Sequence, residues 1–292
     1  MKIAIAVATA GRPDLVPRVL QYMATQSRPA DILAVCPATP KDCDLDRIPK
    51  EIDVRVISSS VGSCAQRNAL IREIDADVMV FFDDDFLPAP DFLFELEKLM
   101  TEHGDVVVAT GHVAADGING PGFDYEEALG IVEDLGPNVA GNALTNVNNG
   151  YGCNMAIRLD VAKSQGITFD ENLPLYGWLE DVDFSRRLAA FGRVVKSERL
   201  RGVHMGTKTS GRSPGKRLGY SQMANRIYLV RKGTLTRSQM WSGNFNNLAA
   251  NTVKSLAPEP WVDRRGRLLG NSLALWDWMT RKLDTTKITK FK

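Results

Sequence analysis

Three consecutive carboxylates, Asp83, Asp84 and Asp85, directly follow the apolar run VMVFF at residues 78–82. Like charges repel one another, so a buried strand can end in three of them only if water or a cation offsets the charge. Side chains alternate along an extended segment, and Asp83 and Asp85 are therefore expected to point to the same side. Carboxylate oxygens with room for water suit Mg²⁺ or Mn²⁺, which bridge the phosphates of a nucleotide. The run predicts a metal and nucleotide site, with a solvated acidic turn or a helix N-cap before Pro88 as the structural alternative.

The residues around this run predict alternating strands and helices. The first predicted helix opens with Pro13 and Asp14, which favour a first turn, and its apolar residues recur on one stripe. Such alternation implies a largely parallel sheet, in which ligands bind beyond the carboxyl ends of the strands. The acidic run lies at such an end. The predicted strands span residues 2–8, 32–36, 54–58, 77–82 and 105–110, and the predicted helices span 13–25, 64–73 and 91–102.

Length and composition indicate a globular chain of one or two domains. It has 292 residues, of which 44% are hydrophobic and 24% charged, so a sizeable core can be buried. The apolar run at residues 3–10 is far shorter than the ~18 residues that a membrane-spanning helix needs. We interpret it as a first strand rather than part of a signal peptide, because it leads into the turn GRP. We therefore expect a cytoplasmic protein whose four cysteines are free thiols.

The net charge of +1 hides a strong asymmetry along the chain. Up to His204 there are 19 Lys and Arg against 31 Asp and Glu, a balance of −12, whereas from Met205 onward there are 17 against 4, a balance of +13. The basic part therefore suits an anionic partner, which includes nucleic acid, anionic lipid and a diphosphate-bearing substrate. A solvated basic face without a partner is the alternative.

Four further stretches follow in a fixed order around the acidic run. They are ATAGRP after the first strand, SVGSCAQRNALI at 60–71, GYGCNMAIRLD at 150–160, and FDENLPLYGWLEDVDFSRRLAAFG at 169–192. With the three aspartates, this order resembles the family 2 glycosyltransferases of the bacterial exopolysaccharide type over about residues 3–232. These are inverting enzymes with the GT-A fold. The acidic strand end resembles the family's DXD motif, and Glu180-Asp181 resembles its later ED pair.

The resemblance implies a mostly parallel central sheet flanked by helices, the GT-A fold, with a C-terminal helical extension. Residues 1–232 are expected to form the catalytic domain, in which 1–111 bind the nucleotide and 112–232 supply the acceptor site and a lid. Residues 233–292 are expected to form the helical extension. The segment 112–148, which would shape the sugar pocket, shows no readable pattern.

An inverting transfer needs a base that deprotonates the acceptor hydroxyl and positive charge that stabilises the departing nucleoside diphosphate. By resemblance Asp181 is the predicted base, Glu180 is the second candidate, and Asp183 is expected to be a bystander at the helix start. Tyr176 and Trp178 offer flat apolar faces to an acceptor sugar, although core aromatic residues under the sheet would look the same.

The donor nucleotide is expected across the first strand ends. By resemblance Thr9 and Arg12 flank the base, Asp85 holds the metal, and His204 supplies a nitrogen ligand to it, although a lone histidine is often structural. The segment 202–217 reads as a phosphate lid, a solvated linker or a basic lipid-facing loop. The remaining residues assigned to the nucleotide sugar are Arg67, Asn68, Asp83 and Asp84 at the strand ends, and Lys208 and Arg212 in the lid.

Helical patterns at 219–233 and 238–256 precede the stretch RRGRLLGNSLALWDWMTRKL at 264–283. Trp276 and Trp278 beside basic residues are typical of an interfacial helix on an anionic membrane. A helix docked on its own protein, or a homodimer contact, would use the same apolar stripe.

Together these features predict an inverting, metal-dependent glycosyltransferase that uses Mn²⁺ or Mg²⁺ and a UDP-sugar. The expected acceptor is a polysaccharide or a lipid-linked saccharide, and peripheral association with the inner face of the plasma membrane is a further expectation. One alternative is a sugar-nucleotide nucleotidyltransferase, although ATAGRPDL lacks the glycine-rich loop that handles a triphosphate. Another is a noncatalytic basic module for membrane or nucleic acid, but an acidic strand end repels nucleic-acid phosphates.

Overall fold

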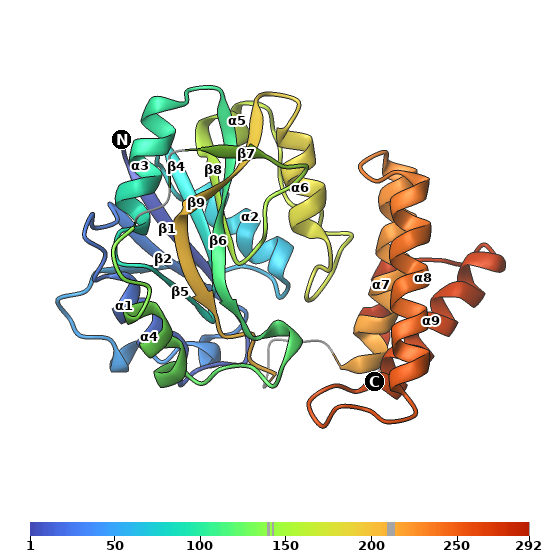
Figure 1. The fold of residues 1–292 in the computed structure, drawn as a ribbon. Coiled ribbons are helices and arrows are strands. Elements are labelled where there is room, and N and C mark those ends of the chain that lie inside the picture. The colour runs from blue at the N-terminus through green and yellow to red at the C-terminus, as the bar shows by residue number, and fades with distance from the viewer. Residues whose placement is uncertain (139–140, 142, 209–213, 292) are drawn as a thin grey trace.

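The computed structural model describes residues 1–138, 141, 143–208 and 214–291. Its strands form one sheet with helices on both faces, and three further helices lie together on one side of this unit (Figure 1). The strands are β1 (Ile3–Thr9), β2 (Ile32–Pro37), β3 (Val54–Val56), β4 (Val78–Asp83), β5 (Phe86–Pro88), β6 (Val106–Asp116), β7 (Leu144–Asn146), β8 (Asn154–Arg158) and β9 (Arg193–His204). The α-helices are α1 (Val16–Met23), α2 (Ser63–Glu73), α3 (Phe92–Glu102), α4 (Tyr125–Glu133), α5 (Leu159–Ser164), α6 (Glu180–Leu188), α7 (Gly215–Lys232), α8 (Arg237–Lys254) and α9 (Arg264–Met279).

The sheet is mixed, and parallel strands fill its N-terminal half. The strand order is β3-β2-β1-β4-β8-β6-β9-β5, with β7 paired to β9 beside this path. Strands β3, β2, β1 and β4 are parallel, β6 is parallel to β9, and β8 is antiparallel between β4 and β6. This sheet with flanking helices confirms the predicted α/β, GT-A-like fold. The predicted strands and helices lie in their predicted places within a few residues, except that β6 continues to Asp116.

The central strands are buried on both faces of the sheet. In β1, Ile3, Ile5 and Val7 face one core, whereas Ala4 and Ala6 face the other. Helices α1, α3 and α4 contribute to the first core, and α2, α5 and α6 contribute to the second (Figure 1). Parallel strands covered by helices on both sides need apolar residues at every position. This explains the unbroken apolar runs of the sequence.

Parallel strands bring their carboxyl ends to the same edge of the sheet. The register pairs Ala8 of β1 with Asp83 of β4, so the acidic run starts beside the end of β1. Helix α2 begins beyond this edge after Gly62, whose φ of 134° lies in a region that glycine adopts far more readily than other residues. The chemistry-bearing side chains therefore gather at this edge.

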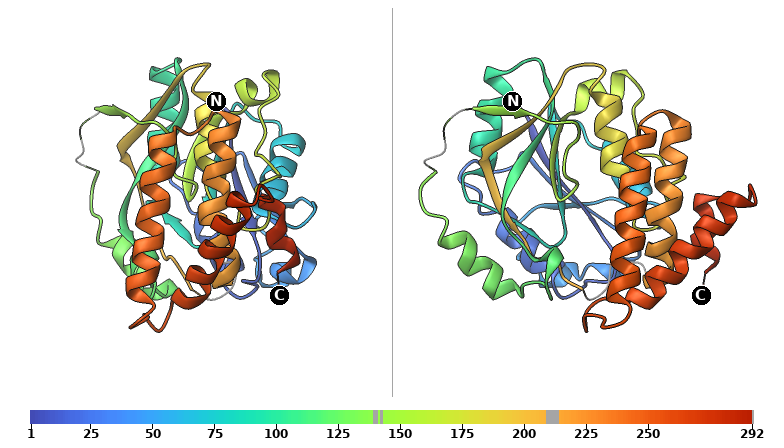
Figure 2. Two further views of the ribbon diagram at one scale, coloured as in Figure 1. Left: turned by 90° about the vertical axis from the view of Figure 1, so that its right-hand side faces the viewer. Right: turned by 45° about the vertical axis from the view of Figure 1, so that its right-hand side comes forward.

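Helix α7 connects the sheet unit to α8 and α9. Tyr220, Met223 and Ala224 of α7 pack with Ala274 of α9, whereas Leu229 of α7 joins a core of the sheet unit. The views in Figure 2 show the three helices beside the sheet unit, with α9 against α7. Helix α7 thus contacts both the sheet unit and α9. The domain boundary predicted at residue 232 stays a prediction.

The structure also gives the state of the cysteines and the length of the apolar helices. All four cysteines are buried free thiols, as predicted. None of the helices in the described ranges is long and apolar enough to cross a membrane.

Candidate functional site

A pocket of about 330 Å³ opens at the carboxyl ends of β1 and β4. Its wall combines the end of β1, the start of α2, the acidic run, the loop before α6, the end of β9 and the start of α7. The charged and polar residues that line it are Thr9, Arg12, Ser63, Gln66, Arg67, Asp83, Asp84, Asp85, Tyr176, His204 and Arg217. Most of the residues predicted for the nucleotide thus line one cavity.

The three aspartates divide between two sides of the strand end. Asp83 and Asp85 each offer an oxygen within 4.8 Å of a ring nitrogen of His204 and of one another. Asp84 instead accepts a hydrogen bond of 2.6 Å from the Thr9 hydroxyl and forms an ion pair with Arg12. Asp83 and Asp85 thus share a side as predicted, although Asp84 and Asp85 form a turn between β4 and β5 rather than part of a strand.

The pKa values of the buried aspartates differ because their neighbours differ. Burial raises the pKa of Asp84 to about 6, although Arg12 opposes this rise. Burial also disfavours the charged form of Asp85, but Arg12 and His204 outweigh this effect and hold the pKa of Asp85 below its usual range. Asp85 therefore remains an anion and suits a cation.

His204 bridges two carboxylates at the end of β9. Its Nε2 lies 3.4 Å from Asp85, and its Nδ1 lies 2.9 Å from Asp116, whose second oxygen accepts a hydrogen bond of 3.0 Å from the Tyr151 hydroxyl. Burial alone would lower the pKa of His204, but the hydrogen bonds to Asp116 and Asp85 raise it to about 10. Asp116 therefore fixes the orientation of the His204 ring from the side opposite Asp85.

The donor set at this point fits a divalent cation. Two carboxylates and one imidazole converge with all three ligand atoms within 4.8 Å of one another. Carboxylate oxygen with imidazole nitrogen suits Mn²⁺ and related ions. Asp85 and His204 were predicted as the ligands, and Asp83, predicted to contact the nucleotide, joins them in this cluster.

Arg67 links the acidic run to the ED pair. The fully buried guanidinium donates to Glu180 over 2.7 Å and to Asp83 over 2.9 Å. Burial and the neighbouring Asp181 raise the pKa of Glu180 to about 8, although Arg67 opposes them. The Asp181 carboxylate accepts hydrogen bonds from the backbone N–H groups of Gly152 over 2.9 Å and of Val182 over 2.8 Å. Burial raises the pKa of Asp181. Both carboxylates are held in place at the start of α6.

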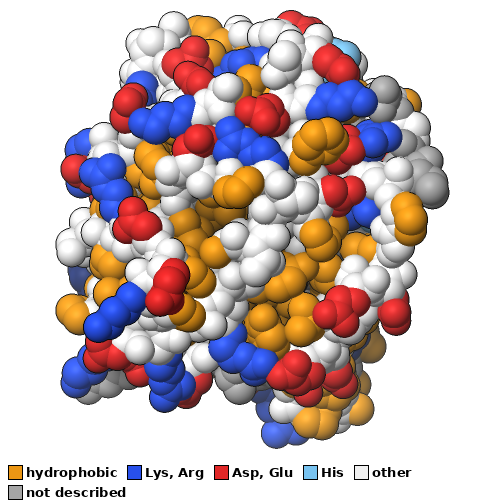
Figure 3. All heavy atoms as spheres, turned by 90° about the vertical axis from the view of Figure 1, so that its left-hand side faces the viewer, with side chains coloured by type: hydrophobic (Ala, Val, Ile, Leu, Met, Phe, Trp, Pro, Cys, Tyr) orange, Lys and Arg blue, Asp and Glu red, His pale blue; other side chains and the backbone are white. Residues whose placement is uncertain are grey.

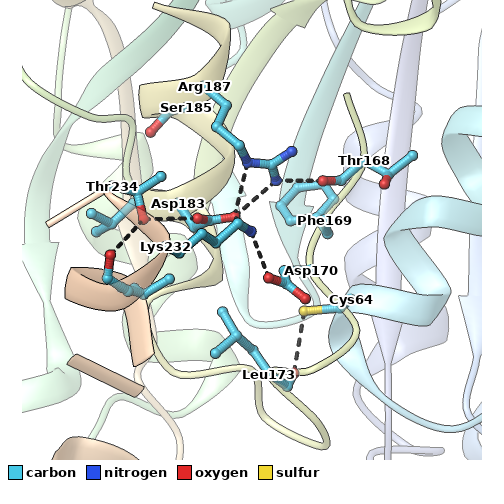
Figure 4. Close-up of polar contacts among 12 residues, drawn as sticks. Cys64, Thr168, Phe169, Asp170, Leu173, Asp183, Ser185, Arg187, Lys232 and Thr234 are labelled. Carbon is cyan, nitrogen blue, oxygen red and sulfur yellow. Dashed lines mark hydrogen bonds and ion pairs between the residues drawn. The ribbon is translucent and has the colours of Figure 1, made fainter. Parts of the chain in front are cut away.

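Asp183, predicted to be a bystander, lies in a separate polar network. It is fully buried, and it accepts bonds from Lys232 over 2.8 Å, from Thr234 over 2.9 Å and from Arg187 over 3.0 Å (Figure 4). Lys232 also contacts Asp170 over 2.5 Å. The network ties the end of α7 to α6 and to the loop before it.

Some predicted site residues lie outside the pocket. The Asn68 amide bonds to the backbone of Phe169 and to Glu171, on the other side of α2. The Lys208 ammonium donates to the carbonyls of Gly117 and Ile118. Arg212 lies outside the described residues. The nucleotide contacts predicted for these three residues stay predictions.

The two aromatic residues predicted for the acceptor lie together. Tyr176 lines the pocket, and its ring centroid is 6.3 Å from that of Trp178. Trp178 is half-buried, and its indole nitrogen has no hydrogen-bond partner among the residues that the structure describes. Tyr176 thus lies at the pocket, with Trp178 as its neighbour outside the lining.

Sequence reasoning assigned no role to Gln66, Asp116 and Tyr151, and it included Arg217 only as part of the predicted lid segment 202–217. Gln66 donates to the carbonyl of Thr9 over 2.8 Å and so ties α2 to the end of β1. Arg217 lines the pocket from α7, and its side chain donates to the carbonyl of Phe291. Gln66 directly precedes Arg67 in the stretch SVGSCAQRNALI at 60–71, and this position was the available signal.

Comparisons with a family model and with solved structures show what the chain is similar to. Residues 42–165 match the family Glycosyl transferase family 2. No curated protein sequence matches the chain. Among solved structures, S. aureus TarS 1–349 has a TM-score of 0.54 at 14% identity, covering 96% of this chain and 92% of that one. The mannosyltransferase PcManGT from Pyrobaculum calidifontis, in complex with GDP-Man and Mn²⁺, has a TM-score of 0.55 at 16% identity, covering 99% and 85%.

A second TarS 1–349 structure, in complex with UDP, has a TM-score of 0.51 at 14% identity and covers 96% of this chain and 92% of that one. At these identities the solved structures establish a shared fold, and the family match carries the assignment. Residues 42–165 thus resemble a family 2 glycosyltransferase domain, and the chain is a glycosyltransferase.

Proposed function

We propose that this glycosyltransferase is inverting and metal-dependent, and that it moves a sugar from a nucleoside diphosphate donor to a polysaccharide or lipid-linked saccharide. The observation that carries the proposal is the convergence of Asp83, Asp85 and His204 on a pocket that Arg12 and Arg217 also line. Nucleotide or nucleotide-sugar complexes of proteins with this fold support it, and one of them includes Mn²⁺. A UDP-sugar is the proposed donor.

Asp83, Asp85 and His204 would hold the cation, with Mn²⁺ or Mg²⁺ as the proposed ion. When bound, a divalent ion supplies positive charge that offsets the charge of the departing diphosphate. Arg12 pairs with Asp84 and Asp85 and thereby keeps two adjacent carboxylates stable at the strand end before the ion binds. Thr9 and Arg12 therefore have two proposed roles. They hold Asp84, and they flank the nucleotide base.

Asp181 is the proposed base, and the surrounding contacts support this role over Glu180. Glu180 is engaged by Arg67 over 2.7 Å, whereas the bonds to the Asp181 carboxylate from the described part of the chain come from backbone N–H groups and leave lone pairs for an acceptor hydroxyl. The elevated pKa of Asp181, caused first by burial, makes it a better proton acceptor than an exposed aspartate. Tyr176 and Trp178 are proposed to hold the acceptor sugar, with Tyr176 at the pocket and Trp178 beside it.

The lid and the cellular setting complete the proposal. Lys208 and Arg212 are proposed to close over the diphosphate and exclude water, which requires Lys208 to leave the two carbonyls that it contacts. We place the enzyme in the cytoplasm, peripherally associated with the inner face of the plasma membrane, where a lipid-linked acceptor is accessible. A homodimer contact through the exposed apolar helix faces is the alternative use of the same side chains.

The test separates donor binding from transfer. A thermal-shift screen of UDP- and GDP-sugars with Mn²⁺ identifies the donor, because a ligand that binds only the folded state raises the unfolding temperature. Release of the nucleoside diphosphate with saccharide acceptors then measures transfer. Asp181→Asn is expected to reduce transfer by about 10² to 10⁴ and to leave donor affinity close to the parent value. Asp85→Asn is expected to weaken Mn²⁺-dependent donor binding itself.

Glu180→Gln is the matched control, because it changes the adjacent carboxylate in the same way. If Asp181→Asn transferred at the parental rate while Glu180→Gln did not, the base would be Glu180. If no nucleotide sugar stabilised the parent protein with Mn²⁺, the proposed donor class would be wrong. Circular dichroism of each variant confirms that it is folded.

A further inference from the structure

Helices α8 and α9 expose a stripe of large apolar side chains. On α8, Trp241 and Phe245 are 54% and 70% exposed. On α9, Leu269, Trp276 and Met279 are 52%, 62% and 61% exposed. Their spacings of four, seven and three residues place them on one side of each helix. The ring of Trp241 packs edge-on against that of Trp278 at 5.5 Å, which places the start of α8 beside the end of α9. We call the exposed apolar surface of the two helices the aromatic face, and it comprises Trp241, Phe245, Leu269, Trp276 and Met279.

The aromatic face lies away from the contacts that hold α8 and α9 to α7. Met240, Asn244 and Asn251 of α8 are buried, as are Gly270, Asn271 and Ala274 of α9. Asn271 donates to the carbonyl of Gly219 over 2.6 Å, so α9 is docked on α7 through its opposite side. The sequence left open whether α9 packs on the protein or meets a membrane. One side of the helix packs, and the other side remains available.

Positive charge surrounds the aromatic face. Arg237 lies one turn before Trp241, Arg265 one turn before Leu269, and Arg281 and Lys282 directly after Met279, and all four are exposed. Residues 237–292 contain ten Lys and Arg against four Asp and Glu, a balance of +6.

The four carboxylates of this region are all engaged. Glu259 pairs with Lys254 and Arg264, Asp277 pairs with Lys287, and Asp263 and Asp284 cap local backbone turns. On the face of the molecule that looks away from these helices, acidic and basic side chains are interspersed (Figure 3). The uncompensated positive charge therefore accompanies the aromatic face.

We propose that the aromatic face docks on an anionic lipid surface. Tryptophan and phenylalanine rings enter the boundary between headgroups and acyl chains, and arginine and lysine at the edges contact lipid phosphates. Two helices lying on the surface give binding without a membrane-spanning segment, which agrees with the helices that the structure describes. Docking itself requires neither donor binding nor transfer. It rests on the proposed function only in its biological role, which is to bring the enzyme to the proposed lipid-linked acceptor.

A second copy of the chain fits the same surface less well. A two-fold contact through the aromatic face would press the same positively charged surface of two copies together. Like charges at an interface oppose association, whereas anionic headgroups offset them. The charge around the face thus favours lipid over a second copy.

Vesicle binding by the full chain tests the proposal. We expect sedimentation with vesicles of phosphatidylglycerol and phosphatidylcholine, much weaker sedimentation with phosphatidylcholine alone, and weaker binding at high salt. The variant Trp241→Ser/Phe245→Ser/Trp276→Ser is expected to lose at least about tenfold in vesicle affinity. Arg237→Gln/Arg265→Gln/Arg281→Gln/Lys282→Gln is expected to lose the preference for anionic vesicles. Brominated lipids should quench tryptophan fluorescence in the parent and much less in the triple variant.

The matched controls change exposed residues of the sheet unit. Phe94→Ser/Phe191→Ser removes two apolar side chains that are 55% and 47% exposed, and Lys41→Gln/Lys50→Gln/Arg55→Gln removes three exposed cations. Both controls should bind vesicles like the parent, and all variants should keep the parental circular dichroism and donor affinity. Parental vesicle binding by the triple variant would overturn the proposal. So would a dimeric parent that the triple variant converts to a monomer and that ignores vesicles. Either failure would leave donor binding, and with it the proposed reaction, unaffected.

Discussion

Asp116 determines how His204 presents its ring to the acidic cluster. Because Asp116 engages Nδ1 over 2.9 Å, Nε2 is the nitrogen that faces Asp85. Metal-binding histidines are commonly oriented by such a carboxylate, and loss of it typically costs about 10- to 100-fold in metal affinity. We therefore expect Asp116→Ala to weaken Mn²⁺ binding to the nucleotide complex by about that factor, as measured by electron paramagnetic resonance titration. His204→Ala should weaken it at least as much.

Tyr151→Phe is the control for this prediction. It removes only the hydroxyl that donates to the second oxygen of Asp116 over 3.0 Å, and a smaller loss is expected. If Asp116→Ala bound Mn²⁺ like the parent while His204→Ala did not, the carboxylate would have no role in orienting the ring.

For single site residues, the sequence predicts the arrangement of those that are close to one another along the chain. The prediction that Asp83 and Asp85 lie on one side of the strand end, with Asp84 on the other, is correct, although a turn at Asp84 and Asp85 produces this arrangement. Asp116 could not be found in this way, because the parallel pairing of β6 with β9 brings it opposite His204 from 88 residues away. Irregularities in that pairing set the register, and no local pattern encodes them.

Among the elements, α7 is fixed to the sheet unit through Lys232 at its end. The ammonium contacts Asp170 over 2.5 Å and Asp183 over 2.8 Å, and Asp183 is fully buried (Figure 4). We expect Lys232→Met to lower the free energy of unfolding by about 2 kcal/mol, because a buried carboxylate loses one of its partners. Urea denaturation measures this change. Lys98→Met on α3 is the control and should stay within about 0.5 kcal/mol of the parent.

The pH dependence of this difference identifies its cause. Burial alone would raise the pKa of Asp170, but bonds from Lys232, Tyr228 and the Asn172 backbone lower it to about 2. A carboxylate with a lowered pKa stabilises the fold above its unfolded pKa of about 4, and this contribution disappears as the pH falls toward 2. The difference between parent and Lys232→Met should therefore shrink over that range. A constant difference would indicate lost packing of the lysine stem instead.

The strands and helices of the N-terminal half were predictable because they are buried on both faces and carry strong apolar periods. The segment from 112 to 148 was not, although α4 within it begins with a capping box formed by Asp124 and Glu127. This short helix buries only Ala128 and Val132 fully, so its apolar period is too weak to identify it. Capping chemistry was the usable signal there.

In the whole molecule, the start of α7 contributes to the pocket from the end of the predicted lid segment 202–217, whereas its support by the chain beyond α9 was not suggested by the sequence. Pro214 and Arg217 at the start of α7 line the cavity, and Arg217 is held by the carbonyl of Phe291 beyond α9. Truncation after Pro260 would remove α9 and Phe291 together and would disturb donor binding as well as membrane binding. Point substitutions are therefore needed to separate the two.

Gly219 tests whether close packing of α9 on α7 supports the donor pocket. A methyl group at Gly219 would overlap the backbone of Arg267 on α9, whereas one at Gly130 on α4 would meet open space. Overpacking of this kind costs about 1 to 3 kcal/mol, so Gly219→Ala should lower the free energy of unfolding by that amount. Gly130→Ala should instead be stabilising by about 0.4 to 1 kcal/mol, because alanine restricts the unfolded chain. Since the start of α7 lines the pocket, Gly219→Ala should also raise the dissociation constant of the donor, as measured by calorimetry, while Gly130→Ala should not. A destabilised Gly219→Ala variant that binds donor with parental affinity would show that the helices and the pocket are independent.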